Sequence, residues 1–394
     1  MRLIDGIPVW GDADPGALAQ IRTCARFAQR VALMADNHTG YGVPIGGVMA
    51  MVESVSPTGV GYDIGCGNKA VLTDLPAAAV RDRIDTIMDD IWRTISFGIG
   101  RKNAEPVDHD LFDDGAWRIP AVRRLRDKAA SQLGTVGSGN HYVDVLADEQ
   151  DRVWIGVHFG SRGFGHGVAT HYLNAGGAKN GMDAEPLVLS VRSNLGAEYV
   201  AAMELAGRYA YAGRDWVCQR VVDLLGGHVF DEVHNHHNFA WKESHVIDGQ
   251  ELDLWVVRKG ATPAFPGQRG FVGGSMGDVS VILEGVEHEQ AAESLCSTVH
   301  GAGRVMSRTA AAGKVNRRTG EVIRPGAISQ EMLADWLRRE RVVLRGGGLD
   351  EAPQAYRRLP DVLKHHAGSV RILHELRPLG VAMAGANEFD PYKD

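Results

Sequence analysis

The spacing of hydrophobic and polar residues changes several times along the chain, and each change predicts a change of secondary structure. Apolar residues recur every three or four positions over residues 76–94, 119–133 and 185–225, the spacing of helices with one buried face. A helix is also expected from Asp14 to Val31, because Asp14 can cap it and Pro15 suits its first turn. Residues 302–344 and 353–377 are expected to contain further helices.

Short apolar runs punctuated by glycines lie between these helices and predict strands joined by tight turns. They cover residues 36–72, 134–165 and 228–300, whereas the polar residues 98–118 indicate a loop. No internal repeat or low-complexity linker divides the chain. The pattern therefore predicts an α+β fold: a single large mixed α/β domain over residues 1–394, with a helical excursion near residues 167–226.

Composition and charge narrow the class of protein. With 44% hydrophobic and 23% charged residues the chain has ordinary globular values, which excludes disorder for most of it. A net charge of −7 argues against a bulk nucleic-acid binder, so any nucleic-acid partner needs a local basic groove. The four cysteines lie far apart without a CxxC pair, which favours a reducing, cytoplasmic compartment over a disulfide scaffold. No signal peptide and no membrane span are expected.

Four glycine-rich segments carry side chains of the kinds that bind transition metals. They are Asp63 and Cys66 in GVGYDIGCG, His141 after GSGN, His158 at the end of an apolar run, and His234, His236 and His237 in VHNHHN. Each segment alone suits a buried structural residue equally well. Together they offer thiolate, imidazole and carboxylate, which suit Zn²⁺, Mn²⁺, Fe²⁺ or Co²⁺ better than Mg²⁺ or Ca²⁺. A structural zinc site would use more cysteines, so a catalytic site is expected, with Asp36 and His38 as supporting or substrate-binding residues.

A candidate nucleophile lies near the C-terminal third of the chain. His300 is followed by Gly-Ala-Gly-Arg, where small residues expose backbone N–H groups that could hold a phosphate together with Arg304. A histidine beside an anion site can act as general acid or base or as a covalent nucleophile. An incidental histidine in a glycine turn is the alternative. The basic segment 258–277, which ends in GGSMG, is either a second phosphate loop or a surface hairpin.

These segments, taken in order, resemble the RtcB family of RNA ligases. The similarity rests on GVGYDIGCG, GTVGSGNHYVDV, HFGSRGFGH, HHNFAWKE, RKGATPAFPGQ, GSMG, HGAGRVMSR and LRPLGV, which together span nearly the whole chain. Residues 167–226 match poorly. The combination of HGAGR with GSGNH and DIGCG is specific enough to make chance agreement negligible.

The resemblance implies an activity and its cofactors. The family joins an RNA 3′-phosphate or 2′,3′-cyclic phosphate to a 5′-hydroxyl, in tRNA splicing or RNA repair. It uses GTP and Mn²⁺, so two Mn²⁺ ions, GTP and RNA with these ends are the expected cofactors and partners, with no membrane. A histidine attacks the α-phosphate of GTP, the guanylyl group passes to the RNA 3′-phosphate, and the 5′-hydroxyl then displaces GMP. Whether an activating protein partner is needed stays open.

The resemblance also implies residue roles. His300 corresponds to the guanylylated nucleophile. Cys66 would be shared by both ions, with His158 and His237 on one and Asp63 and His141 on the other, whereas His234 and His236 fall outside the register. Arg162 would contact phosphate with Arg304. The implied nucleotide and phosphate contacts are Asn140, Asp144, Asn238, Ser275, Ser280, Gly301, Ala302, Gly303, Arg304 and Tyr356.

Two positions depart from the family pattern. The family reads guanine with a glutamate and a lysine, where this chain has Asp144 and Met383. We therefore expect a divergent paralogue with weakened discrimination between GTP and ATP. Two other functions stay open at this point: a metal-dependent phosphoesterase or nuclease, and a non-catalytic protein that binds RNA ends.

Overall fold

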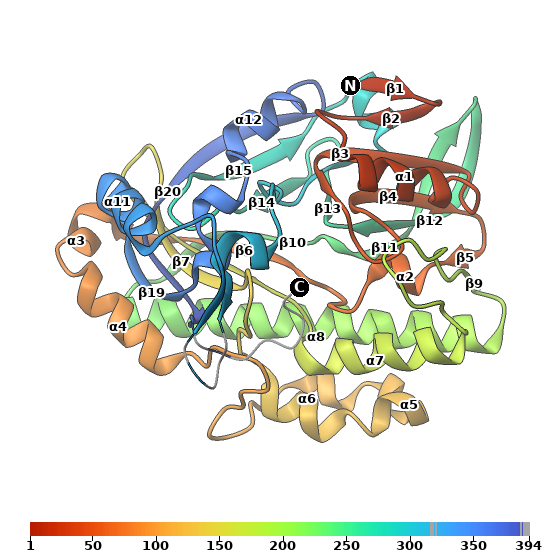
Figure 1. Cartoon of the computed structure of the whole chain (residues 1–394). Coiled ribbons are helices and arrows are strands. Elements are labelled where there is room, and N and C mark those ends of the chain that lie inside the picture. Colours follow the sequence, from red (N-terminus) through yellow and green to blue (C-terminus); the bar gives the residue numbers. More distant parts are fainter. Residues whose placement is uncertain (316–318, 320, 387, 389–394) are drawn as a thin grey trace.

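The computed structural model describes every residue except 316–318, 320, 387 and 389–394 (Figure 1). Helices and strands are interspersed along the described chain, so the expected mixed α/β class is confirmed. Most of the strands belong to two large sheets, and the long helix α8 (Asn194–Leu225) packs against residues of both.

One sheet has six strands and is built mainly from the N-terminal part of the chain. In spatial order its strands are β1 (Arg2–Ile4), β2 (Ile7–Val9), β3 (Arg30–His38), β4 (Ile45–Met51), β12 (Gln250–Lys259) and β11 (Asn238–Ile247). All neighbours are antiparallel except β2 and β3, which are parallel.

The other sheet has eight strands and lies beside the first. Its order is β10 (Val229–His236), β6 (Gly67–Pro76), β8 (Arg152–Phe159), β7 (Tyr142–Ala147), β20 (Val370–Gly385), β15 (Ser280–Gly285) and β14 (Arg269–Val272), with β19 (Val343–Gly347) pairing parallel to β20. Because β10 ends at His236 and β11 begins at Asn238, the chain passes from one sheet to the other at His237.

Helices and short strand pairs surround these sheets. The helices besides α8 are α1 (Pro15–Cys24), α2 (Pro57–Val60), α3 (Ala77–Arg81), α4 (Ile84–Thr94), α5 (Pro120–Arg123), α6 (Arg126–Gln132), α7 (Arg162–Ala175), α9 (Glu289–Glu293), α10 (Arg308–Ala312), α11 (Gln330–Glu340) and α12 (Leu359–Lys364). The strand pairs are β5 (Ser54–Val55) with β9 (Leu189–Ser190), β13 (Ala261–Pro263) with β16 (Ser297–Val299), and β17 (Gly313–Val315) with β18 (Val322–Pro325).

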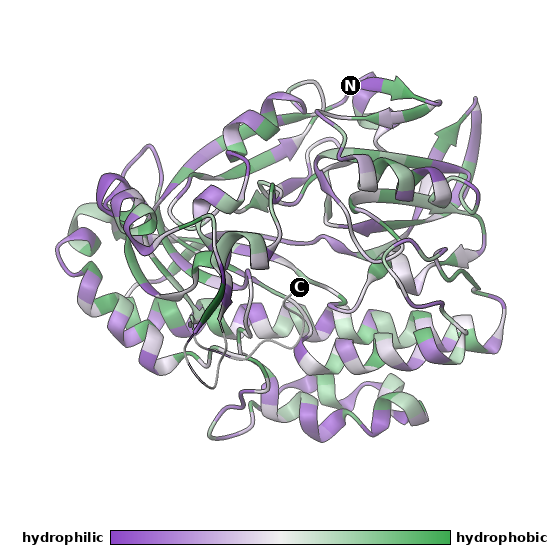
Figure 2. Ribbon diagram, viewed as in Figure 1, coloured by the Kyte–Doolittle hydropathy of each residue, from purple (hydrophilic) through white to green (hydrophobic). Residues whose placement is uncertain are grey.

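The core forms on both sides of the sheets. The C-terminal half of α8 buries Val217 and Val221 against strand residues of the eight-stranded sheet such as Val143 and Ile155. Its N-terminal half packs with α7 in the cluster that includes the inner face of the six-stranded sheet. Figure 2 shows hydrophobic and hydrophilic residues alternating along α4 and α8, as expected of helices with one buried face. Residues 167–226 thus form most of α7, together with β9 and α8, and α8 is part of the main core.

Predicted helix ends are correct where a cap defines them. The side chain of Asp14 accepts a hydrogen bond from the Ala17 N–H and Pro15 occupies the first turn, as expected for α1. The predicted continuation to Val31 is wrong, because α1 ends at Cys24 and β3 begins at Arg30. A strand buried on both faces has an unbroken apolar run, which resembles a buried helix in sequence.

The helix expected within residues 353–377 is present as α12, but it is much shorter than that range. A 3₁₀ helix at Pro353–Ala355 precedes α12, and β20 occupies residues from Val370 onward. No helix in the described part of the chain is long and apolar enough to cross a membrane.

Candidate active site

The candidate ligands come together in a cavity of about 280 Å³ at the junction of the two sheets. The cavity is lined by residues at the ends of strands and in the short links between consecutive strands. His38 ends β3, His237 lies between β10 and β11, and Gly260 lies between β12 and β13. Cys66 lies immediately before β6. The site is therefore built from strand ends that the sheets hold in place.

Cys66, His141 and His158 form a buried cluster of possible metal donors. The Cys66 Sγ lies 3.6 Å from Nε2 of His141 and 3.5 Å from Nε2 of His158. A metal at about 2.3 Å from sulfur and 2.0–2.1 Å from nitrogen, with tetrahedral angles, separates those donors by about 3.6 Å. The donor set therefore fits a transition-metal ion in both chemistry and spacing.

Asp63 and His237 flank this cluster, as the resemblance implies. One carboxylate oxygen of Asp63 lies 3.1 Å from Nε2 of His141. The His237 backbone N–H donates to the Cys66 carbonyl at 2.8 Å, and the rings of His237 and His158 stack 5.1 Å apart. Nε2 of His237 is buried without a hydrogen-bond partner. A buried nitrogen in that state needs an explanation, and a bound ion supplies one.

The ionisation of the imidazoles and of Asp63 suits metal binding, whereas burial and the charge of Asp63 raise the pKa of the Cys66 thiol. Burial holds the pKa values of His158 and His237 well below their usual range, so both imidazoles are neutral and keep a lone pair. Burial alone would raise the pKa of Asp63, but the hydrogen bond and charge of His141 and the charge of Arg162 bring it below its usual value. Asp63 is therefore a carboxylate at neutral pH.

Neighbouring side chains orient two of the imidazoles. The amide oxygen of Asn68 lies 2.6 Å from Nδ1 of His158, which leaves Nε2 of that ring facing Cys66. Nδ1 of His237 lies 3.3 Å from the amide oxygen of Asn238, which also accepts from the Gly260 N–H. Sequence reasoning did not single out Asn68, because nothing in its local pattern distinguishes it.

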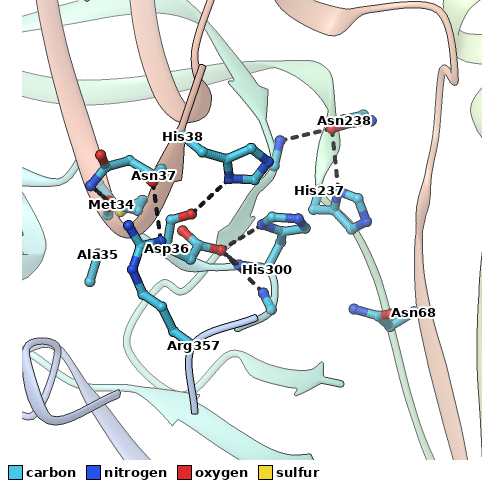
Figure 3. Close-up of polar contacts among 12 residues, drawn as sticks. Met34, Ala35, Asp36, Asn37, His38, Asn68, His237, Asn238, His300 and Arg357 are labelled. Carbon is cyan, nitrogen blue, oxygen red and sulfur yellow. Dashed lines mark hydrogen bonds and ion pairs between the residues drawn. The ribbon is translucent and has the colours of Figure 1, made fainter. Parts of the chain in front are cut away.

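His300 lies beside this cluster, and a buried carboxylate fixes its orientation (Figure 3). Nδ1 of His300 is 2.6 Å from the Asp36 carboxylate, which also accepts from the backbone N–H groups of His300 and Gly301 at 3.0 and 3.2 Å. The centroids of the His300 and His237 rings are 4.7 Å apart. His38, whose pKa burial lowers to about 4, is neutral and lies in the same cavity. Asp36 thus leaves Nε2 as the free nitrogen of His300.

Most of the implied nucleotide and phosphate contacts line the cavity. They are Asn140, Asp144, Asn238, Ser275, Gly301, Ala302, Gly303, Arg304 and Tyr356. Ser280 does not. It is buried behind the glycine loop, where its hydroxyl accepts a hydrogen bond from the Gly274 N–H.

The expected phosphate-binding arginines contact protein groups in this structure. Arg304 donates to the Tyr356 hydroxyl at 2.7 Å and lies 3.1 Å from the Glu351 carboxylate. Arg308 lies 3.1 Å from the other oxygen of that carboxylate. Arg162 does not line the cavity, and it places Nη1 3.1 Å from Nδ1 of His141. Arg308 could have been found, because it ends the HGAGRVMSR segment, but Glu351 has no comparable signal in the sequence.

The basic segment 258–277 divides between the core and the cavity. Arg258 is fully buried and paired with Glu243, and the ammonium group of Lys259 donates to the carbonyls of Tyr41 and Thr58. These two cations therefore support the fold and do not face the cavity, whereas the glycine loop that carries Ser275 does.

One wall of the cavity is largely apolar. Tyr142, Met276, Val381 and Met383 line it, and Asp144 contributes a carboxyl with one oxygen buried and unpartnered. Burial raises the pKa of Asp144 well above its usual value. This wall could hold a flat ring that offers hydrogen-bonding groups to a protonated carboxyl.

Comparisons with known proteins agree on one family. Residues 17–118 and 114–384 match the family model described as tRNA-splicing ligase RtcB. A protein named tRNA-splicing ligase RtcB from Thermococcus kodakarensis is 32% identical over 89% of this chain and 86% of its own length. RNA-splicing ligase RtcB of Escherichia coli is 31% identical, over 94% of both chains. RNA-splicing ligase RtcB homolog 1 of Entamoeba histolytica is 29% identical over 93% of this chain and 84% of its own length.

Proposed function

The chain belongs to the RtcB family, and from that premise we propose that it is an RNA ligase that joins a 3′-phosphate or 2′,3′-cyclic phosphate end to a 5′-hydroxyl end. The observation that carries this proposal is the pairing of His300 with Asp36 beside a Cys–His cluster in one cavity. Tight Asp36 contact on Nδ1 leaves a single nucleophilic nitrogen, and it lies next to groups that can hold metal ions.

Five residues would hold two Mn²⁺ ions. Cys66 would be shared, His158 and His237 would bind one ion, and Asp63 and His141 the other. The stacked His158 and His237 rings, and the 3.1 Å approach of Asp63 to His141, support this division. When bound, such ions neutralise charge on phosphate oxygens during phosphoryl-type transfer.

His300 would act as the nucleophile on GTP. Its Nε2 attacks the α-phosphorus, an N–P bond forms, and the bond to the departing pyrophosphate breaks. The proton on Nδ1 stays in its hydrogen bond to Asp36, whose carboxylate balances the positive charge that develops on the ring. Burial of Asp36 is offset by the charge and hydrogen bonds of His300, which keep the pKa of that carboxyl below its usual value.

The later steps regenerate His300. A 3′-phosphate oxygen of the RNA attacks the guanylyl phosphorus and the N–P bond breaks. The RNA 5′-hydroxyl then attacks the 3′-phosphorus, loses its proton and releases GMP. Water must first open a 2′,3′-cyclic phosphate. Asn140, Asn238 and the backbone N–H groups of Ala302 and Gly303 line the cavity and could orient phosphate oxygens.

Intact-mass measurement after incubation with Mn²⁺ and GTP tests this proposal. We expect the addition of one guanylyl group, labile in acid and stable in base as a phosphoramidate is. His300→Gln should abolish the adduct, and RNA carrying 3′-phosphate and 5′-hydroxyl ends should be joined only by the wild type. Cleavage of RNA without an adduct would support a metal-dependent phosphoesterase instead. Binding of RNA ends without either reaction would support a non-catalytic protein.

The proposal also covers the cellular compartment and the source of the RNA ends. All four cysteines are free thiols, which suits a cytoplasmic enzyme in a reducing compartment. Repair of broken RNA and tRNA splicing both supply the proposed ends. Ligation assays with and without cell extract would show whether an activating protein partner is needed.

A further inference from the structure

Arg214 is a fully buried arginine in the middle of α8, behind the candidate metal ligands. No carboxylate pairs with it at ion-pair distance within the described residues. Burial lowers the pKa of its guanidinium, but an arginine stays protonated in a protein. Leaving such a cation inside a core is costly unless its N–H groups are satisfied, so its hydrogen-bond partners explain why it is there.

Two of its partners are main-chain carbonyls next to candidate ligands. Nη1 of Arg214 donates to the Gly65 carbonyl at 2.9 Å and to the Phe159 carbonyl at 2.6 Å. Gly65 directly precedes Cys66, and Phe159 directly follows His158. One guanidinium nitrogen therefore links the backbone at Cys66 to the backbone at His158.

The third contact reaches the neighbour of His237. Nη2 of Arg214 lies 2.9 Å from Nδ1 of His236. The same ring nitrogen also lies 2.9 Å from the Gly65 carbonyl oxygen, so the His236 ring is held against both Arg214 and the residue that precedes Cys66. Burial and the charge of Arg214 hold the pKa of His236 well below its usual range, which agrees with a neutral ring.

His234 accepts the remaining contact, from Nε of Arg214 at 2.8 Å. Burial and the charge of Arg214 keep its pKa well below the usual range as well. Three histidines in four positions therefore divide into two roles. His237 lines the cavity, whereas His234 and His236 are not among the residues that line it and both contact the guanidinium of Arg214.

We propose that Arg214 is a positioning residue of the metal centre, which fixes the residues adjacent to Cys66, His158 and His237 relative to one another. These three ligands come from separate chain segments that pair through β6, where Gly67 lies opposite both Phe159 and His236. Arg214 adds side-chain contacts to that backbone pairing. The helix can approach closely because Gly207 and Ala210 are small: a side chain at Gly65 would lie 3.1 Å from the Ala210 Cβ. This inference rests on the metal part of the proposed function.

Titration of the metal-free full-length protein with Co²⁺, followed by thiolate-to-cobalt absorption, tests it. Arg214→Met removes every hydrogen-bond donor of the side chain. Arg214→Lys keeps the positive charge but loses the planar arrangement of several N–H donors. We expect Co²⁺ affinity to fall about 10- to 100-fold in Arg214→Met, with Arg214→Lys in between. Arg220→Met, an exposed position on the same helix, is the matched control and should bind like the wild type.

A purely structural arginine would give a different result. It would lower the melting temperature of metal-free and metal-loaded protein equally and leave the dissociation constant unchanged, so an unchanged constant in folded Arg214→Met overturns the proposal. If that variant does not fold, wild-type affinity in Arg214→Lys overturns it. A wild type that binds no Co²⁺ refutes both this inference and the metal part of the proposed function. Tight Co²⁺ binding without a guanylyl adduct refutes only the proposed ligation chemistry.

Discussion

Asp144 shows how far a single residue can depart from its usual ionisation. Its carboxyl lies at the apolar wall of the cavity, and burial with no compensating cation raises its pKa well above the usual value. Asp148, which directly follows β7, has the same exposed fraction but accepts hydrogen bonds from Trp154 and Arg152, which lower its pKa against the effect of burial. The two carboxyls therefore test, in opposite directions, how burial and hydrogen bonding shift the pKa of an aspartate.

We predict that Asp144→Asn stabilises the ligand-free protein above about pH 4, where an unfolded aspartate ionises. The native carboxyl holds its proton more tightly than the unfolded chain does, so the wild type loses stability as the pH rises from there towards the native pKa. Each unit of difference between the native and unfolded pKa values corresponds to about 1.4 kcal/mol of lost stability. An asparagine does not ionise and therefore avoids this loss. Urea unfolding between pH 4 and 8 measures the effect.

Asp148→Asn is the control and should show the opposite sign. Its native pKa is lowered, so the wild-type carboxylate contributes stability at neutral pH that disappears as the pH falls. The variant should be less stable than the wild type at pH 7 and approach it in acid. Equal pH profiles for Asp144→Asn and the wild type would contradict an unusual ionisation of Asp144.

Under the proposed function, we expect the choice of nucleotide to depend on Asp144 and on Met383. A protonated carboxyl both donates and accepts, which matches the N1 and N6 groups of adenine, whereas guanine offers two donors and requires a carboxylate. Met383 cannot donate to a guanine carbonyl. Because a charge-assisted hydrogen bond contributes about 1.5–3 kcal/mol, we predict GTP over ATP discrimination of about 100-fold or less. Competition labelling of His300 with all four nucleotides measures it, and strict GTP use would contradict this assignment of the base pocket.

At the scale of elements, the sequence pattern predicts those helices whose ends and buried faces are determined by residues close together in the chain. The cap at Asp14, the amphipathic stretch 76–94 and much of the long helix are correct, because their signals lie within a few residues of one another. The misassigned segments lie in β3 and β20, which are central strands whose conformation comes from pairing with distant partners. Similarly, HGAGR marked His300 as reactive, but only the structure shows that β3 supplies Asp36 to orient it.

The contact between the 300–304 segment and β3 can be tested at Gly303. Gly303 has a φ of +76°, and a side chain there would overlap the carbonyl oxygen of Asp36. We expect Gly303→Ala to lower stability by about 1 kcal/mol for the left-handed conformation, plus a further loss from displacement of Asp36. Guanylylation of His300 should slow as well, because its orienting carboxylate moves.

Gly249→Ala separates these two contributions. Gly249 has a similar φ of +80°, but a side chain added there meets nothing within 4 Å. It should therefore lose only the conformational part and keep wild-type guanylylation. Equal urea midpoints and equal labelling rates for the two variants would contradict the proposed contact between Gly303 and Asp36.

At the scale of the whole molecule, the site depends on long-range assembly. Asp63 and Cys66 share one turn and could be paired from sequence, but His141, His158 and His237 reach them only because β6, β7, β8 and β10 lie together in the eight-stranded sheet. The sequence offered candidates without distances, and the family resemblance supplied their grouping. Residues that act through others, such as Asn68 and Arg214, have no motif of their own, since their roles exist only in the packed fold.

Metal binding should therefore stabilise the entire fold, and Cys66 should control it. Metal bound only by the native state adds about 2.7 kcal/mol per site at a free concentration of 100 times the dissociation constant. With a shared thiolate, Cys66→Ala should bind neither ion and lose the whole of this gain, whereas His141→Ala should keep one ion and about half. Metal analysis of the purified proteins, combined with thermal unfolding at matched Mn²⁺ concentrations, measures both quantities. Cys218→Ala removes another buried thiol, one outside the cavity, and should keep full metal content. Two ions retained in Cys66→Ala would rule out a bridging thiolate, and the two-ion arrangement would then have to rest on Asp63 and the histidines alone.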